Sequence, residues 1–116
     1  MGKDFKEIKD ICHLVVSVLS SDSDVKEIFL FGSYARGDAN IQSDIDIAII
    51  HNEHVSSSFF PKLRQEFLRA YNDDIHVQFS YLTESAYLTD NHILNIAKTV
   101  REEGISLWKS QGHIFT

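Results

Sequence analysis

The segment from Ile28 to Ile50, IFLFGSYARGDANIQSDIDIAII, constrains the fold more than any other part of the chain. It predicts an apolar strand that ends at Gly32-Ser33, a short polar crossover, and a second strand that begins at Asp44. Asp44 and Asp46 are two residues apart, so both carboxylates lie on one face of the second strand. Two like charges at this spacing repel each other, and a divalent cation is the simplest compensation. The segment therefore predicts a metal-binding carboxylate pair beside a glycine-serine turn.

The hydrophobic pattern of the rest of the chain predicts a small mixed sheet. Apolar residues at helical spacing predict helices over residues 4–20, 58–71 and 91–103, with short helical turns at 33–36 and from Thr83-Glu84. Further strands are expected over 75–82 and, at a sheet edge, over 105–108. The link between the first two strands is too short for the crossover that a parallel pair needs. We expect an α/β (α+β) fold in one domain, residues 1–116, with helices mainly on one face of the sheet and the other face open beside the turn.

Charge and composition narrow the classes of function. A net charge of −6 without a lysine and arginine cluster argues against charge-driven binding to nucleic acid. There is no apolar run of membrane-spanning length and no signal-peptide core at the start, so we expect a cytoplasmic protein without membrane contact. The single cysteine, Cys12, fits a reducing compartment, and its place on an apolar helix face predicts a buried packing residue.

The glycine-serine turn and the carboxylate pair suggest one chemistry when they are taken together. A turn between a buried strand and a helical turn presents backbone N–H groups to phosphate oxygens, and Ser33 adds a hydroxyl. Gly32 permits close approach of the backbone. Mg²⁺ takes few protein ligands and completes its shell from phosphates and water, so Asp44 and Asp46 suffice for one ion. These residues predict Mg²⁺-dependent phosphoryl-type transfer from a nucleoside triphosphate.

The same residues carry a resemblance to a known family. Gly32-Ser33, ten further residues and then Asp44-x-Asp46 resemble the GS-x10-DxD signature of nucleotidyltransferases with a DNA-polymerase-β-like fold. The string FGSYARGDANIQSDIDIAII looks like the minimal nucleotidyltransferase group, and the ending EEGISLW is similar as well. The resemblance covers most of the chain. It implies that Gly32 and Ser33 contact the triphosphate and that Asp44 and Asp46 are the catalytic metal ligands.

Two positions stay open under this resemblance. Arg36 is either a nucleotide-binding neighbour of the phosphates or a solvent-exposed helix residue. The family supplies a third carboxylate from the next strand of the sheet, where this chain has Ile75-His76-Val77-Gln78-Phe79. His76 or Gln78 occupies that acidic position, or Asp74 substitutes for it because it has the same strand parity. Without a third acid, the number of metals and the activity itself become open questions.

The resemblance also implies a reaction and a partner. It points to transfer of a nucleoside monophosphate, AMP from ATP, onto a hydroxyl with release of pyrophosphate. At this length the chain has no room for an acceptor-holding domain, so a partner protein must supply the acceptor. Minimal domains of this family pair, as antitoxins, with helical HEPN proteins in a hetero-oligomer. The alternatives are a catalytically degenerate binding module that neutralises its partner by contact and a nucleotide-sensing regulatory subunit.

Overall fold

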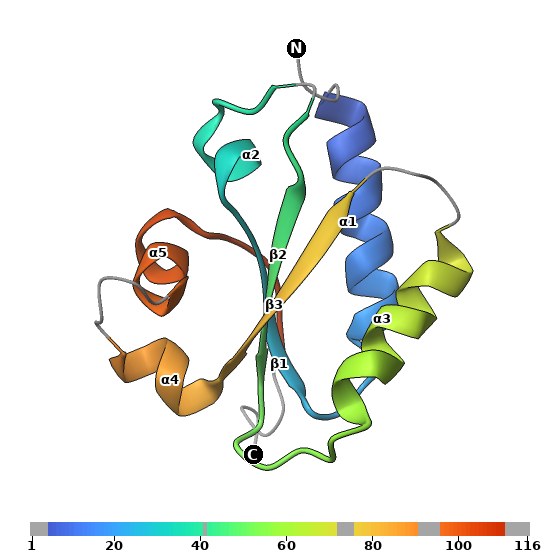
Figure 1. Ribbon diagram of the computed structural model, residues 1–116, viewed down its shortest axis with the longest axis vertical. Coiled ribbons are helices and arrows are strands. Elements are labelled where there is room, and N and C mark those ends of the chain that lie inside the picture. Colours follow the sequence, from blue (N-terminus) through green and yellow to red (C-terminus); the bar gives the residue numbers. More distant parts are fainter. Residues whose placement is uncertain (1–4, 41, 72–75, 91–95, 111–116) are drawn as a thin grey trace.

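The computed structural model describes residues 5–40, 42–71, 76–90 and 96–110 (Figure 1). The first half of the chain forms α1 (Phe5–Leu19), β1 (Val25–Phe31), α2 (Ser33–Arg36), β2 (Ile45–His51) and α3 (Phe59–Ala70). The second half forms β3 (Val77–Thr83), α4 (Glu84–Thr89), α5 (Ile96–Glu103) and β4 (Ile105–Lys109). The predicted elements are confirmed, with shifts of one or two residues at several ends. Residues 72–75 and 91–95, where two predicted elements begin, lie outside the described residues.

The described strands form one sheet in the order β3-β2-β1-β4. β1 pairs antiparallel with β2 and with β4, whereas β2 pairs parallel with β3. The short β1–β2 link turns the chain directly back, while α3 supplies the crossover that a parallel pair needs. The expected mixed sheet is therefore confirmed, and β4 is an edge strand as predicted.

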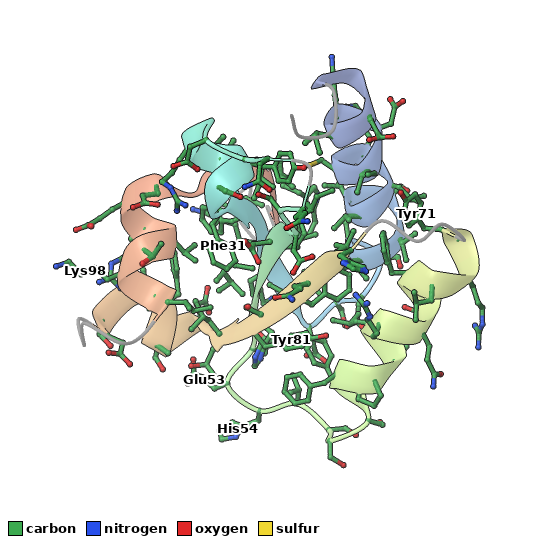
Figure 2. All side chains as sticks on the ribbon, turned by 45° about the horizontal axis from the view of Figure 1, so that its top comes forward. Phe31, Glu53, His54, Tyr71, Tyr81 and Lys98 are labelled. Atoms are coloured by element: carbon green, nitrogen blue, oxygen red, sulfur yellow. The ribbon has the colours of Figure 1, made fainter. Side chains whose placement is uncertain are left out.

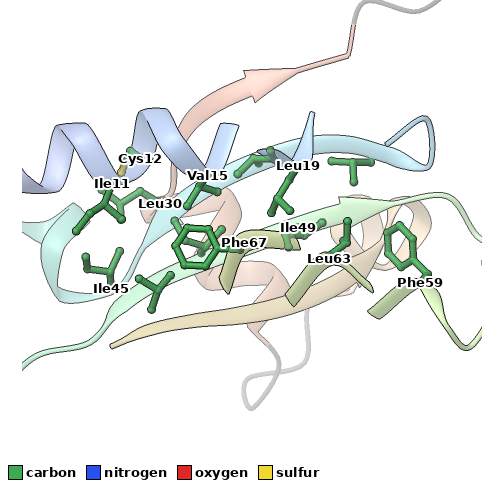
Figure 3. Packing of buried hydrophobic residues seen from close by; sticks show 14 residues of the cluster. Ile11, Cys12, Val15, Leu19, Leu30, Ile45, Ile49, Phe59, Leu63 and Phe67 are labelled. Carbon is green, nitrogen blue, oxygen red and sulfur yellow. The ribbon is translucent and has the colours of Figure 1, made fainter. Parts of the chain in front are cut away.

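The two long helices α1 and α3 cover one face of the sheet (Figure 1). Under them lie Ile45, Ile47 and Ile49 of β2, on the face opposite to Asp44 and Asp46, and all three are fully buried. Figure 3 shows the helix side chains that pack over this layer, among them Val15 from α1 and Phe67 from α3. Cys12 is buried at its margin as predicted, and burial raises the pKa of its thiol to about 11. A neutral thiol of this kind is a packing residue.

The two short helices α4 and α5 lie on the opposite face (Figure 1). The sequence predicts that this face is open beside the turn, but α4 and α5 cover the part of it that carries Ala48 and Ile50 of β2. A second apolar cluster fills the space between them, built from Phe29, Phe31, Ala48, Ile50, Leu82, Ala97 and Val100. The same face of β2 changes from partly exposed at Asp44 and Asp46 to fully buried at Ala48. The opening is thus confined to the start of β2.

The helices α3 and α4 differ in the hydrogen bonds at their N-caps. Ser57 or Ser58 could cap α3 by sequence, and Ser58 lies at its N-cap, with Pro61 in the first turn, but the Ser58 side chain makes no capping hydrogen bond. Thr83 does cap α4, because its hydroxyl accepts a hydrogen bond from the N–H of Ala86.

Among the described residues, no helix has both the length and the apolar character that crossing a membrane requires.

Glu53 fastens the loop after β2 to the start of α4 (Figure 2). Its carboxylate accepts hydrogen bonds from the N–H and from the hydroxyl of Ser85, each at 2.7 Å. The Ser85 N–H group is the first cause of a lowered pKa of Glu53. A lowered carboxyl pKa means that the contact stabilises the fold above the unfolded-state pKa and is lost as the pH falls through the folded-state pKa.

We therefore expect Glu53→Gln to lower the Tm at pH 7, because the amide removes the charged acceptor at the helix N-terminus. The difference between the variant and the parent protein should shrink as the pH falls below the ordinary Glu pKa of about 4.3. Thermal unfolding followed by circular dichroism at pH 7 and at acidic pH measures both values. Glu102→Gln, at an exposed carboxylate of α5, serves as the control. A Tm difference that does not depend on pH would contradict the assignment.

Candidate active site

The turn after β1 brings the backbone against a carboxylate of β2. Phe31 and Asp46 are direct partners in the antiparallel β1–β2 pair, so Gly32 follows beside Asp46. Gly32 has φ 76° and ψ −154°, a conformation that is open essentially to glycine alone. A Cβ built on Gly32 would overlap Oδ2 of the Asp46 side chain. Both the conformation and the close approach therefore require glycine at this position.

Ser33 begins α2 directly after this glycine. The Gly32 carbonyl accepts hydrogen bonds from the N–H groups of Ala35 and Arg36, and the Ser33 carbonyl accepts from Gly37 and Asp38. Two N–H groups of this four-residue helix, those of Ala35 and Arg36, are therefore used by the Gly32 carbonyl, and the N–H and hydroxyl groups of Ser33 lie at the start of the helix. Such groups attract anions. The turn and the carboxylate of Asp46 thus meet at one place, as the sequence-based hypothesis requires.

Asp44 and Asp46 lie on the same face, directly before and within β2. Burial is the first cause that raises the pKa of Asp46, and the negative charge of Asp44 raises it further. The guanidinium of Arg36 lowers that pKa, which is the weakest of the three influences. The ionised pair is therefore electrostatically unfavourable in the protein alone, and a cation beside both carboxylates would relieve the repulsion.

Strand β3 brings His76 and Gln78 to Asp44. The Gln78 side-chain amide donates a hydrogen bond to Oδ2 of Asp44 at 2.8 Å, and Nδ1 of His76 lies 3.2 Å from Oδ1. Of the alternatives for the third acidic position, His76 and Gln78 contact the Asp44 carboxylate, and which residue fills that position stays a prediction. Asp74 lies outside the described residues. In the described part of this strand region, an amide and an imidazole thus contact the Asp44 carboxylate.

Arg36 extends from α2 toward α5. Its guanidinium pairs with Asp38 at 3.1 Å and with Glu103 at 3.3 Å. Arg36 is exposed, so these ion pairs contribute little to the free energy of unfolding. They do orient the guanidinium toward Asp38 and Glu103. Glu103 is a residue that the sequence reading missed, since 67 positions separate it from Arg36 and it carries no local signal. Whether Arg36 also contacts a nucleotide remains a prediction.

The donor set suits one divalent cation that shares its shell with a substrate. Among the described residues, no group of three or more histidine, cysteine, aspartate or glutamate side chains is arranged to hold a metal. Two carboxylates on one face of a strand are nevertheless suitable ligands for Mg²⁺ when phosphate oxygens supply the others. Asp44 and Asp46 would hold such an ion.

The nucleotidyltransferase domain family matches residues 12–105. The chain belongs to this family. The match spans β1, the Gly32-Ser33 turn, both carboxylates and the whole described sheet as far as the first residue of β4. Family membership confirms the resemblance drawn from the GS-x10-DxD motif and identifies the chain as a nucleotidyltransferase domain.

Curated relatives of this nucleotidyltransferase domain come from Methanocaldococcus jannaschii, and each is named a "putative protein adenylyltransferase". One is 44% identical over 57 residues, which are 49% of this chain and 57% of the relative. Another is 43% identical over 54 residues, covering 47% of this chain and 55% of the relative. The chain spans about half the length of the curated relatives that it matches.

Solved structures share the fold of this nucleotidyltransferase domain. A "putative nucleotidyltransferase" from Sulfolobus solfataricus is 24% identical, with a TM-score of 0.59 over 97% of this chain and 95% of that one. A Shewanella oneidensis MNT antitoxin complex with a tri-AMPylated HEPN toxin gives a TM-score of 0.56 at 20% identity, covering 90% of this chain and 74% of that one. These likenesses confirm the predicted nucleotidyltransferase fold. That residues 1–116 form one domain stays a prediction.

Proposed function

We propose that this domain is a Mg²⁺-dependent nucleotidyltransferase that moves AMP from ATP onto a hydroxyl of a partner protein. The observation that carries the proposal is the contact between Gly32 and the Asp46 carboxylate. It joins a phosphate-binding type of turn to a metal-binding type of carboxylate pair at the open end of the sheet. Neither feature alone would distinguish nucleotide transfer from simple anion binding.

Each residue has a distinct role in the proposed reaction. The turn at Gly32 and Ser33 binds the triphosphate through backbone N–H groups and the Ser33 hydroxyl. Asp44 and Asp46 hold the cation, which when bound supplies positive charge against the triphosphate and the departing pyrophosphate. Arg36, at the end of α2, adds positive charge on the same side. These side chains orient the α-phosphate for in-line attack.

The transfer itself is a single displacement at phosphorus. The acceptor oxygen forms a bond to the α-phosphorus while the bond from that phosphorus to the bridging oxygen of the β-phosphate breaks. Pyrophosphate departs with the electron pair, and the acceptor hydroxyl gives its proton to water. Catalysis of such a step rests on positioning and charge stabilisation more than on covalent chemistry by the protein.

The proposed acceptor is a small helical protein of the HEPN type, which this domain would restrain as an antitoxin. Support comes from folds of the same kind. The Shewanella oneidensis structure is described as a tri-AMPylated HEPN toxin in complex with an MNT antitoxin. Another, at a TM-score of 0.58 and 24% identity, is described as a toxin–antitoxin with AMP-PNP and covers 86% of this chain and 74% of that one.

A second candidate function rests on Gln78 and His76, which face Asp44 where a third carboxylate would complete the family's metal site. A domain that had lost turnover could still neutralise its partner by contact. The retained glycine turn and the carboxylate pair argue for the enzyme, because a contact module has no use for two repelling aspartates beside a strained glycine.

Label transfer decides between these functions. The protein is incubated with Mg²⁺, ATP labelled at the α-phosphate and a HEPN-type protein as the proposed partner. We expect label on the partner, and at least a 100-fold loss in the Asp44→Asn/Asp46→Asn variant, as for loss of essential catalytic ligands. Asp10→Asn, at an exposed carboxylate of α1, is the control and should label normally.

Partner toxicity, measured in the same set of variants, supplies the second readout. Neutralisation lost together with label transfer supports the enzyme. Absence of transfer, with neutralisation unchanged in the Asp44→Asn/Asp46→Asn variant, would overturn it in favour of the contact module.

A further inference from the structure

The carboxylate of Asp44 is held from the neighbouring strand on both of its oxygens. Gln78 donates its amide N–H to Oδ2 at 2.8 Å, and His76 lies 3.2 Å from Oδ1. Asp46 has a different surrounding, because the backbone of Gly32 lies against its carboxylate and the charges of Asp44 and Arg36 act on it. The two carboxylates of the pair are thus unequal: one is fixed by side chains, and the other is pressed against the turn.

The register explains why position 78 controls this site. In the parallel β2–β3 pair, Gln78 is the direct partner of Asp46, and both side chains project from the face that also bears Asp44. A side chain at position 78 therefore lies beside both carboxylates. A glutamate there would bring a third negative charge, whereas glutamine fills the same volume without charge.

The hydrogen bond also fixes which end of the amide faces the site. A carboxylate accepts hydrogen bonds and cannot donate when ionised, so Nε2 of Gln78 must face Asp44 and Oε1 must face away. Gln78 consequently presents a donor to Asp44 and contributes no oxygen ligand at that point. It restrains the rotation of Asp44 that repulsion from Asp46 would otherwise favour.

We propose that Gln78 is a positioning residue that fixes the Asp44 carboxylate and restricts the site to one divalent cation. The inference rests on the proposed nucleotidyltransferase function. A preset carboxylate binds a cation with less loss of conformational freedom, and groups that orient metal ligands typically change affinity by 10-fold or more when removed. Among the described residues, Asp44 and Asp46 are the acidic side chains at this site, so nucleotide phosphates would complete the shell of that one ion.

Binding of Mn²⁺ in the presence of a non-hydrolysable ATP analogue tests this, with bound and free Mn²⁺ counted by electron paramagnetic resonance. We expect one Mn²⁺ for each protein molecule. Gln78→Ala should keep that number and raise the Kd about 10-fold. Gln78→Glu should bind a second Mn²⁺, because it supplies the third carboxylate. Ser80→Ala, the next residue on the same face of β3 and the partner of Ala48, is the matched control and should leave both values unchanged.

The outcomes separate this inference from the proposed function. If the parent protein binds two Mn²⁺, or if Gln78→Ala binds Mn²⁺ with the parent Kd, the role of Gln78 is overturned while the nucleotidyltransferase stands. If the parent protein binds no Mn²⁺ with the nucleotide, the proposed function falls and this inference with it. Circular dichroism of each variant checks that the fold is retained, so that a weakened site is not mistaken for an unfolded protein.

Discussion

Gly32→Ala is expected to reduce nucleotide transfer by about 100-fold or more, because a small misplacement of a reacting group has an effect of this size. The alanine would need φ near +76° and ψ near −154°, where side chains are strained, and its Cβ would overlap Oδ2 of Asp46. Either the turn or the Asp46 carboxylate must then shift, and both shifts change how the phosphate-binding groups lie relative to the metal ligands. Strain and overlap together should lower the free energy of unfolding by about 2–3 kcal/mol.

The chain provides a matched control in Gly37. It also has a positive φ, 86°, but with ψ 13° it adopts the ordinary left-handed conformation, and a Cβ there would meet nothing within 4 Å. Gly37→Ala should therefore lower stability by only about 1 kcal/mol and leave transfer largely intact. Thermal unfolding and the label-transfer assay compare the two variants directly. Equal losses in both would show that the approach of Gly32 to Asp46 has no special role.

The elements of this fold follow from local patterns in the sequence. The turn helix of residues 33–36 and the strand that ends at Gly32-Ser33 are observed as predicted, because an apolar run that stops at a glycine leaves few alternatives. The mixed sheet follows from the short link between its first two strands. The coverage of the second face could not be predicted in this way, since α4 has only six residues and its position depends on tertiary packing.

In the candidate site, too, some features follow from residue spacing and others depend on how the strands pair. That Asp44 and Asp46 share a face follows from the period of a strand. The contact of Gly32 with Asp46 depends on the β1–β2 register, which places Phe31 opposite Asp46 and which no local pattern specifies. From the sequence, the third-strand residue that faces the carboxylates could be narrowed only to His76, Gln78 or Asp74. The parallel β2–β3 register then places Gln78 beside Asp46. Long-range pairing, which residue spacing does not encode, decides these points.

Asp46→Asn is expected to abolish transfer and yet stabilise the protein in the absence of metal. Burial and the neighbouring Asp44 charge both raise the pKa of Asp46, so the folded state disfavours its ionised form. Removing the charge should increase the free energy of unfolding by roughly 0.5–1 kcal/mol, the range for like-charged neighbours in a sheet. A Tm increase of about 2–5 °C follows for a domain of this size. Thermal unfolding in EDTA measures it.

Asp44→Asn is the informative comparison, because Gln78 and His76 both contact the Asp44 carboxylate. Its loss removes favourable contacts along with the repulsion, so the Tm in EDTA should stay constant or fall. Two substitutions of the same kind, two residues apart, should thus both abolish transfer while having different effects on stability. A fall in Tm for Asp46→Asn equal to that for Asp44→Asn would contradict the unequal surroundings of the pair.

The pH dependence of the Asp46→Asn effect gives a sharper test of its cause. At a pH below the ordinary Asp pKa of about 3.9, Asp46 is protonated in both the folded and the unfolded states and has no electrostatic cost. As the pH rises from there through the raised folded-state pKa, the unfolded chain loses its proton first, so the parent protein loses stability relative to Asp46→Asn. The excess in free energy of unfolding of Asp46→Asn over the parent protein should therefore grow over that interval and stay constant above it.

Saturating Mg²⁺ with an ATP analogue should make the parent protein the more stable of the two at neutral pH. Only the parent protein retains both ligands for a cation that stabilises the folded state.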